Sequence, residues 1–483
     1  MKFTELYDYP LPGGIVTEWV PATESDPQHW TSDPRPLTYD HEAALRSRTD
    51  RRSNETSWLG AVFEINRRYD PECLRRALQR WMIRHEAFLT IADLAIGRRT
   101  CRAADLTMDA EMIGHVESGT QVTQILTRSF DEHLSPLTWP HVRVASITSL
   151  SSVSADDRFA VVFAADHVVM DAYSIMLSIN EICVLYRAEI DRTAAELPEV
   201  GSHVDFSCDD RRTGLELTDE HPAVGSWRRF LAAQAPSTTP LSVASGPSSL
   251  ETDEPATPRP QRGYSEYVAD AAEADAISAH ARTHGVGTQA AVFAAIALAH
   301  RTMTNNPLLQ LVMPWHTRHE PRFLLSIGWY VGLGPLEVDL TDAETFTDAL
   351  HATGYGIAAA REVSRAPHRR VSEILGAADE PQFVASYLDM RRVPGAADWP
   401  AMHAHTLRSA SYSDREVYLW IARVPTGITL SARYPDSPIA TDIVDRFTGL
   451  VATILRTVAS AGTDLALEHY YACDDRTPTI RTA

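Results

Sequence analysis

An apolar segment in the first half of the chain, RFAVVFAADHV (158–168), ends next to a change in hydrophobic period. Its valine, alanine and phenylalanine residues predict a central β-strand. From Ala172 onward, apolar residues recur at helical spacing as far as residue 190, and Asp171 stands where a helix N-cap is expected. A buried strand followed so closely by a long amphipathic helix predicts a fold of the α/β class.

Strand and helix patterns alternate along both halves of the chain. Around the central strand, further strands are expected at 13–22 and 139–149, and a helix at 69–89. Each half contains several strands and long helices, and no short internal repeat is visible. In the second half, helices are expected at 223–234, 272–285, 288–304 and 440–460, and strands at 264–270, 308–317, 333–340, 381–390, 416–425 and 427–435.

The composition limits the classes of protein to which the chain can belong. With 483 residues and 44% hydrophobic content, it is long enough for two or more globular domains. A formal net charge of -20 opposes long-range attraction to nucleic acid or to an anionic membrane surface. There is no run of about 18 apolar residues and no secretory signal pattern, so no integral membrane segment is expected, and the protein is predicted to be soluble and cytoplasmic. The five scattered cysteines form no CxxC pair, so neither a disulfide framework nor a metal site is expected.

His167 lies where the central strand ends and the following turn begins. A histidine at this place can be exposed at a cleft while the strand behind it stays rigid. Imidazole titrates near neutral pH, so it can accept a proton from an alcohol or amine that attacks a carbonyl group. Asp171 fits a supporting role, because a carboxylate at a helix start can cap amides or pair with an arginine. Taken alone, an HxxxD pair also fits an ordinary packed histidine followed by a helix cap, which is the commoner arrangement.

Several segments together resemble one known superfamily. The strand, the turn DHVVMDA (166–172) and the helix resemble the HHxxxDG motif region of the condensation-domain and chloramphenicol-acetyltransferase-like superfamily. EINRRYDPECLRRALQRWMIRHEAFLT (64–90) looks like its early helix, which ends in an Arg-His-Glu element. HTRHEPRFLLSIGWYVGLGPLEVDL (316–340) is similar to its arginine-bearing loop and the Gly-aromatic strand that follows. The resemblance runs in the expected order from about Gly14 to the final helix, and GWYVG (328–332) and the carboxy-terminal segment look most like the polyketide-associated protein (PapA-type) acyltransferases.

The resemblance assigns roles to single residues. His167 matches the second histidine of the motif, the general base. Asp171 matches the structural aspartate, and Arg318 matches the arginine expected to pair with it. Two positions depart from the motif, because Asp166 stands where the first histidine usually lies and Ala172 replaces the glycine. The first histidine is the less critical one, and Asp166 is expected to face away from the imidazole, since neighbours on a strand alternate sides.

The fold that the resemblance implies is a pseudo-dimer of two chloramphenicol-acetyltransferase-like α/β subdomains with a substrate tunnel between them. The first subdomain is expected to span 1–200 and to carry the HxxxD motif, and the second to span 201–483. A surface loop is expected near 236–262, a stretch crowded with Pro, Ser and Thr. Glycines in the tunnel wall would let an acyl chain pass close to the backbone. The residues expected to line the tunnel are Asp166, Ala172, Gly328, Trp329, Tyr330 and Gly332.

The function that the resemblance implies is acyl transfer. A fatty or polyketide acyl group would move from a thioester of coenzyme A or an acyl carrier protein to a hydroxyl of a sugar or other alcohol, without a metal or redox cofactor. Two alternatives stay open: a condensation-type enzyme that forms an amide with a carrier-bound amine, and a non-catalytic scaffold that binds a carrier protein. No GxSxG elbow, GxGxxG or Walker sequence indicates another chemistry. The protein is expected to be a monomer without a nucleic-acid partner.

Overall fold

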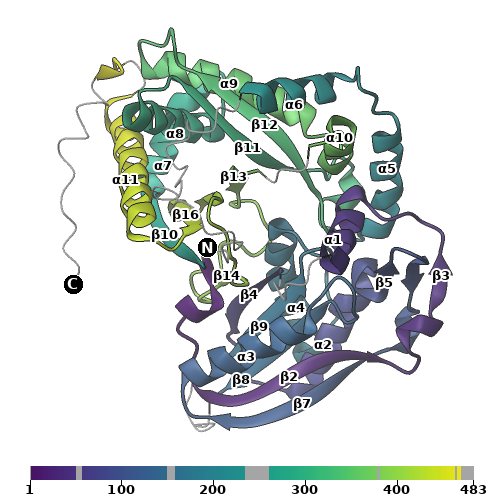
Figure 1. Ribbon diagram of the computed structural model, residues 1–483. Helices are drawn as coiled ribbons and strands as arrows, with labels where there is room; N and C mark the ends of the chain where they lie inside the picture. The colour runs from purple at the N-terminus through teal and green to yellow at the C-terminus, as the bar shows by residue number, and fades with distance from the viewer. Residues whose placement is uncertain are drawn as a thin grey trace, which may run out of the picture.

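The protein contains two large β-sheets, each accompanied by helices, which form a lower and an upper half in Figure 1. A small sheet of three strands lies beside the lower half. This mixed architecture with two subdomains confirms the predicted fold class. The computed structural model describes residues 2–50, 57–149, 158–233, 260–377, 381–462 and 465–468.

The lower sheet is built mainly from the first half of the chain. Its strands follow the order β1-β14-β4-β9-β8-β2-β7. Only β14 comes from the second half among the described residues, so one short strand crosses the predicted boundary near residue 200. The strands of this sheet are β1 (Phe3–Glu5), β2 (Gly14–Thr23), β4 (Trp58–Ile65), β7 (Leu106–Val116), β8 (Val142–Thr148), β9 (Phe159–Asp166) and β14 (His405–Arg408). The small sheet contains β3 (Thr31–Asp33), β5 (Thr90–Asp93) and β6 (Gly97–Thr100).

The upper sheet comes from the second half of the chain. Its order is β10-β16-β15-β13-β11-β12, with parallel pairing of β13 to β11 and to β15 and antiparallel pairing elsewhere. Its strands are β10 (Gln261–Asp270), β11 (Leu308–His316), β12 (Val331–Asp339), β13 (Phe383–Asp389), β15 (Val417–Val424) and β16 (Gly427–Pro435).

Several helices begin at a residue whose side chain caps the first turn. Asp70, for example, precedes α2, and its carboxylate accepts a hydrogen bond from the Cys73 N–H, while Pro71 occupies the first helical position. None of the helices in the described part of the chain has an apolar stretch long enough to cross a membrane. The helices are α1 (Tyr39–Asp50), α2 (Pro71–Arg84), α3 (Gly119–His133), α4 (Ala172–Asp191), α5 (His203–Leu215), α6 (Pro222–Ala233), α7 (Ala271–Thr283), α8 (Thr288–Thr304), α9 (Phe346–Val363), α10 (His368–Leu375) and α11 (Pro438–Ala461).

Strand β9 lies between β4 and β8, and all eight of its residues are buried. Its side chains alternate between two hydrophobic clusters. Val161 and Phe163 pack with residues of α2 and α4 on one face, whereas Val162 and Ala164 pack with residues of α3 on the other. Burial of each large apolar side chain stabilises the fold by about 1.5–3 kcal/mol. The strand that leads to His167 is therefore rigidly held from both faces.

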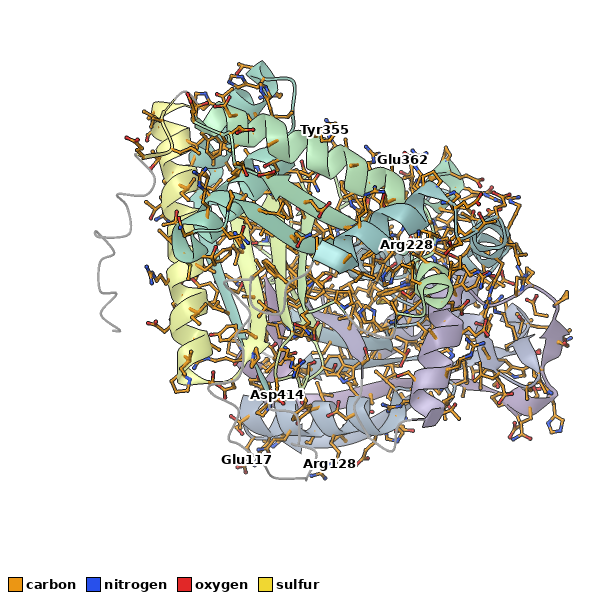
Figure 2. The ribbon with its side chains drawn as sticks, turned by 45° about the horizontal axis from the view of Figure 1, so that its top comes forward. Glu117, Arg128, Arg228, Tyr355, Glu362 and Asp414 are labelled. Carbon is orange, nitrogen blue, oxygen red and sulfur yellow. The ribbon has the colours of Figure 1, made fainter. Side chains whose placement is uncertain are left out.

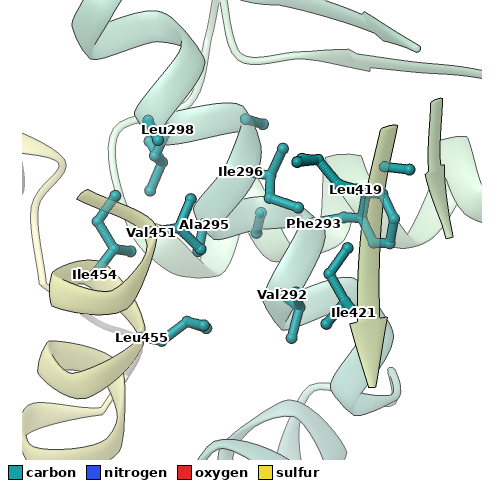
Figure 3. Close-up of a cluster of buried hydrophobic side chains, with 14 of the residues drawn as sticks. Val292, Phe293, Ala295, Ile296, Leu298, Leu419, Ile421, Val451, Ile454 and Leu455 are labelled. Carbon is teal, nitrogen blue, oxygen red and sulfur yellow. The ribbon is translucent and has the colours of Figure 1, made fainter. Parts of the chain in front are cut away.

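Helix α8 forms the centre of the upper core. Figure 3 shows Phe293 and Ile296 near Leu419 and Ile421 of β15, while Leu298 and Ala295 face α11. Residues 290–300 are all buried, as expected for a helix that is apolar on every side.

Charged side chains lie at the periphery of both halves. Figure 2 shows Glu117 and Arg128 at the periphery of the lower half, and Tyr355 and Glu362 along α9 in the upper half. The side chain of Tyr355 is 81% exposed, which is unusual for a large aromatic residue. Among the described residues of α9 it is the only large exposed apolar side chain.

The expected strands and helices are present, with ends that shift by a few residues. One helix is shorter than expected: α2 ends at Arg84, and Glu86–Leu89 form a separate 3-10 turn after His85 leaves helical geometry. The expected loop near 236–262 lies outside the described residues except for 260–262, and Gln261 already belongs to β10.

Candidate active site

His167 follows directly after β9, and its side chain is half-buried. Its backbone N–H donates a hydrogen bond to the Ser57 carbonyl oxygen (3.0 Å). In the side chain, Nδ1 lies 3.0 Å from the carbonyl oxygen of Met170. A carbonyl oxygen only accepts, so Nδ1 carries the proton and donates it to this bond. The lone pair of Nε2 is therefore free to accept a proton from a substrate.

Burial lowers the pKa of His167 to about 4. The hydrogen bond to Met170 and the negative charge of Asp171 act in the opposite direction, and Arg433 adds a smaller lowering effect. At neutral pH the imidazole is consequently uncharged, which is the form that a general base needs.

Asp171 caps helix α4 and holds Arg318. Its Oδ1 accepts a hydrogen bond from the Ser174 N–H (2.7 Å), and its two oxygens receive Nη1 and Nη2 of Arg318 at 2.8 and 3.0 Å. The Tyr330 N–H donates to Oδ2 at 3.0 Å. Asp171 and Arg318 are only 2% and 3% exposed. Burial alone would raise the pKa of Asp171, but Arg318 and these N–H groups hold it below its usual value.

The pair joins α4 of the lower half to the loop between β11 and β12 of the upper half. Arg318 Nη2 also donates to Ser174 Oγ (2.8 Å) and to the Ser326 carbonyl oxygen (3.2 Å). The guanidinium lies 4.3 Å from the centre of the Tyr330 ring. The structure thus brings together the two residues whose pairing the family resemblance implied.

The segment 326–330 places an aromatic ring against the proposed base. The ring centres of Trp329 and His167 are 4.4 Å apart, and the rings are nearly perpendicular at 85°. The Gly328 carbonyl oxygen accepts hydrogen bonds from the Asp171 N–H (3.1 Å) and from Ser174 Oγ (3.0 Å). Trp329 thus contacts His167 directly, whereas Gly328 belongs to the backbone that supports it.

Gly328 and Gly332 are both close-packed against other parts of the protein. A Cβ atom on Gly328 would overlap the His203 ring, and one on Gly332 would overlap the Ser364 carbonyl oxygen. Each glycine therefore permits a close approach of the protein itself, and the passage of an acyl chain along these residues stays a prediction. Tyr330 is fully buried, and its hydroxyl donates to Ser326 Oγ (2.8 Å).

Ala172 is the half-buried first residue of α4, next to the cap residue Asp171. Two cavities of about 470 and 380 Å³ lie elsewhere along α4, one against α2 and the other against the end of β4. The residues that line them do not include His167. The tunnel through the molecule therefore stays a prediction.

Asp166 is buried beside the proposed base, and its Oδ1 accepts a hydrogen bond from the Val168 N–H (2.9 Å). Burial raises the pKa of Asp166 to about 7, although the Val168 N–H and the charge of Arg48 oppose this shift. The folded protein therefore retains a proton that the unfolded chain releases between about pH 4 and pH 7.

We expect Asp166→Asn to stabilise the protein at alkaline pH. As the pH rises through this window, the wild type loses stability, while the neutral amide does not. The difference in unfolding free energy between variant and wild type should grow by about 2 kcal/mol from pH 5 to pH 8, as measured by urea denaturation. An equal difference at both pH values would contradict the assigned environment of Asp166.

Three residues of the site were not singled out from the sequence. Ser174 bridges Arg318 and the 326–330 segment, Ser326 accepts from Arg318, and His203 Nε2 lies 2.8 Å from the Trp329 carbonyl oxygen. Only Ser174 has a local signal, because it lies three residues after a cap residue, where the capped amide is expected.

Comparisons with known proteins agree on one family. The model of the Condensation domain family matches residues 51–391. Acyltransferase PapA3 of Mycobacterium tuberculosis (strain CDC 1551 / Oshkosh) is 25% identical over 353 residues, which are 71% of this chain and 70% of the relative. Trehalose-2-sulfate acyltransferase PapA2 of Mycobacterium bovis (strain BCG / Pasteur 1173P2) is 24% identical over 62% of this chain and 64% of its own length.

Solved structures show the same fold. A PapA2 acyl transferase superposes with a TM-score of 0.81 at 21% identity and covers 95% of this chain and 100% of its own. The condensation domain from the Monacolin K polyketide synthase MokA superposes with a TM-score of 0.66 at 17% identity and covers 90% and 98%. The chain belongs to the condensation-domain family, and within that family it is similar to the PapA acyltransferases.

Proposed function

We propose that the protein transfers an acyl group from a thioester to a hydroxyl group of a sugar or another alcohol. The observation that carries this proposal is the tautomer of His167, because the bond from Nδ1 to the Met170 carbonyl leaves the lone pair on Nε2. The relative PapA2 is named a trehalose-2-sulfate acyltransferase, and trehalose is a sugar, which supports a hydroxyl acceptor.

The chemistry requires one proton acceptor and good alignment. Nε2 of His167 takes the proton of the hydroxyl as its oxygen attacks the thioester carbonyl. The tetrahedral intermediate then expels the thiolate, which receives the proton from the imidazolium. The acyl group is already activated in a thioester, so the pathway needs neither a covalent enzyme intermediate nor a redox step. Coenzyme A and an acyl carrier protein are both donors of this chemical class.

The test compares acceptor molecules that carry different nucleophiles, a hydroxyl or an amine. Purified protein is incubated with a mixture of acyl-thioesters and either sugar alcohols or amines, and products are identified by mass spectrometry. We expect esters with the alcohols. Amide products alone would favour the condensation-type alternative, and no product with any pair would favour the non-catalytic scaffold.

The pH dependence of the reaction should reflect the buried imidazole. Because His167 is active in its neutral form and its pKa is lowered to about 4, kcat/KM should stay level from pH 8 to below pH 5.5. It should fall only at lower pH, where Nε2 becomes protonated. The measurement is a pH series with circular dichroism as a control for folding. An acid limb centred at pH 6.5 or above would show that His167 is not held as described.

A further inference from the structure

A buried His85–Glu181 pair lies behind the segment that presents Trp329 to His167. His85 follows α2, Glu181 lies on α4, and their side chains are 0% and 5% exposed. His85 Nε2 lies 2.6 Å from Glu181 Oε2, and the other carboxylate oxygen accepts from Arg84 Nε (3.0 Å).

The second nitrogen of His85 contacts the upper half of the molecule. The Ile327 N–H donates a hydrogen bond to Nδ1 at 3.3 Å, so Nδ1 is unprotonated. Nε2 therefore carries the hydrogen and donates a hydrogen bond to the carboxylate of Glu181. The carboxylate of Glu181 thus selects the tautomer of His85 that can receive a backbone amide. Ile327 is itself buried, so bulk water cannot replace His85 as the hydrogen-bond partner of this amide.

The segment 326–330 is consequently held from two sides. Asp171 and Ser174 bind the backbone of Gly328 and Tyr330, and His85 binds the backbone of Ile327. Trp329, which lies between these anchored residues, contacts the ring of His167. A shift of the segment would change both the orientation of that imidazole and its contact with water.

We infer that His85 and Glu181 are positioning residues for acyl transfer, because they fix the 326–330 segment and with it the Trp329 ring that orients His167. The expected effect on turnover rests on the proposed function, whereas the expected effect on the order of the 326–330 segment does not. Neither residue touches the reacting atoms. Their contribution is the geometry of a base that must be placed to within a fraction of an ångström.

The test uses two glutamates on the same helix. Glu181→Gln weakens the selection of the His85 tautomer, since an amide can accept from either His85 or Arg84 but cannot accept from both with the same strength. Glu189→Gln is the matched control, because Glu189 also joins α4 to α2, through Arg76 (2.7 Å) and Arg80 (2.7 Å). Among the described residues, the ion-pair partners of Glu189 are Arg76 and Arg80, and neither lies in the 326–330 segment.

We expect Glu181→Gln to lower kcat about 10-fold and to change KM less than about 3-fold. The acid limb of kcat/KM should move toward the ordinary pKa of histidine. Glu189→Gln should leave kcat and KM within about 2-fold of the wild type and the acid limb at its wild-type position. Hydrogen exchange followed by mass spectrometry should show faster exchange of peptides that cover 326–330 in Glu181→Gln only. This readout needs no substrate, so it separates failure of the inference from failure of the proposed function.

Equal effects of the two substitutions on kcat and on exchange would overturn the inference, as would unchanged exchange in a folded Glu181→Gln variant. If that variant does not fold, His85→Gln serves the same purpose, because its amide removes the tautomer-dependent acceptor while it stays polar. Unchanged exchange at 326–330 in that variant would overturn the inference as well.

Discussion

Replacement of His167 by alanine is expected to lower turnover by about 10²- to 10⁴-fold, the range that general-base catalysis contributes. The loss follows from the removal of Nε2, the atom that accepts the proton of the hydroxyl in the proposed mechanism. Thermal unfolding should change little, since the ring is half-buried and its hydrogen bond within the described residues is the one to Met170. Turnover is measured with the thioester and alcohol pair that mass spectrometry identifies.

Chemical rescue provides the control for this variant. Added imidazole can enter the space that the ring leaves beside Trp329 and should restore part of the activity. A folded His167→Ala variant that retains full activity would contradict the assignment of the base.

Removal of the carboxylate of Asp171 is expected to cost about 3–5 kcal/mol of folding stability. Asp171→Ala leaves the guanidinium of Arg318 buried and without its bidentate partner, and it also uncaps α4. The unfolding free energy is measured by urea denaturation. The control is Asp105→Ala, which removes an equally short pair with Arg102. The side chain of Arg102 is 77% exposed, so this substitution should cost far less stability than Asp171→Ala.

A double-mutant cycle separates the pair from its surroundings. Asp171→Asn keeps an acceptor for the cap, and Arg318→Met removes the buried charge. The double variant should be less destabilised than the sum of the two single variants by about 1–3 kcal/mol. Strict additivity would mean that the two side chains do not depend on each other.

The sequence predicted the parts of the site that obey local rules. The change from strand to helical period located His167 at a strand end and Asp171 at a helix start, because both positions follow from spacing alone. Arg318 lies 147 residues from Asp171, and periodicity carries no information on pairing over that separation. Its assignment came from the resemblance to a family.

Other features could not be predicted because they depend on tertiary packing. β14 contains four residues, too few to show a period, yet it pairs with β1 and β4 in the lower sheet. Gly328 and Gly332 were assigned to a tunnel wall from their small size, but in the fold that size admits His203 and the Ser364 backbone. The His85–Glu181 pair joins residues 96 positions apart through a tautomer that no sequence pattern encodes.

The most direct measurement of the central claim is a structure of the wild type with an acyl-thioether analogue of the donor and an alcohol acceptor. The account predicts that the acceptor hydroxyl lies about 2.6–3.2 Å from His167 Nε2, with the acyl carbon in line with that oxygen. Ligands bound at another place, with Nε2 closed off by Trp329 and the surrounding chain, would contradict it.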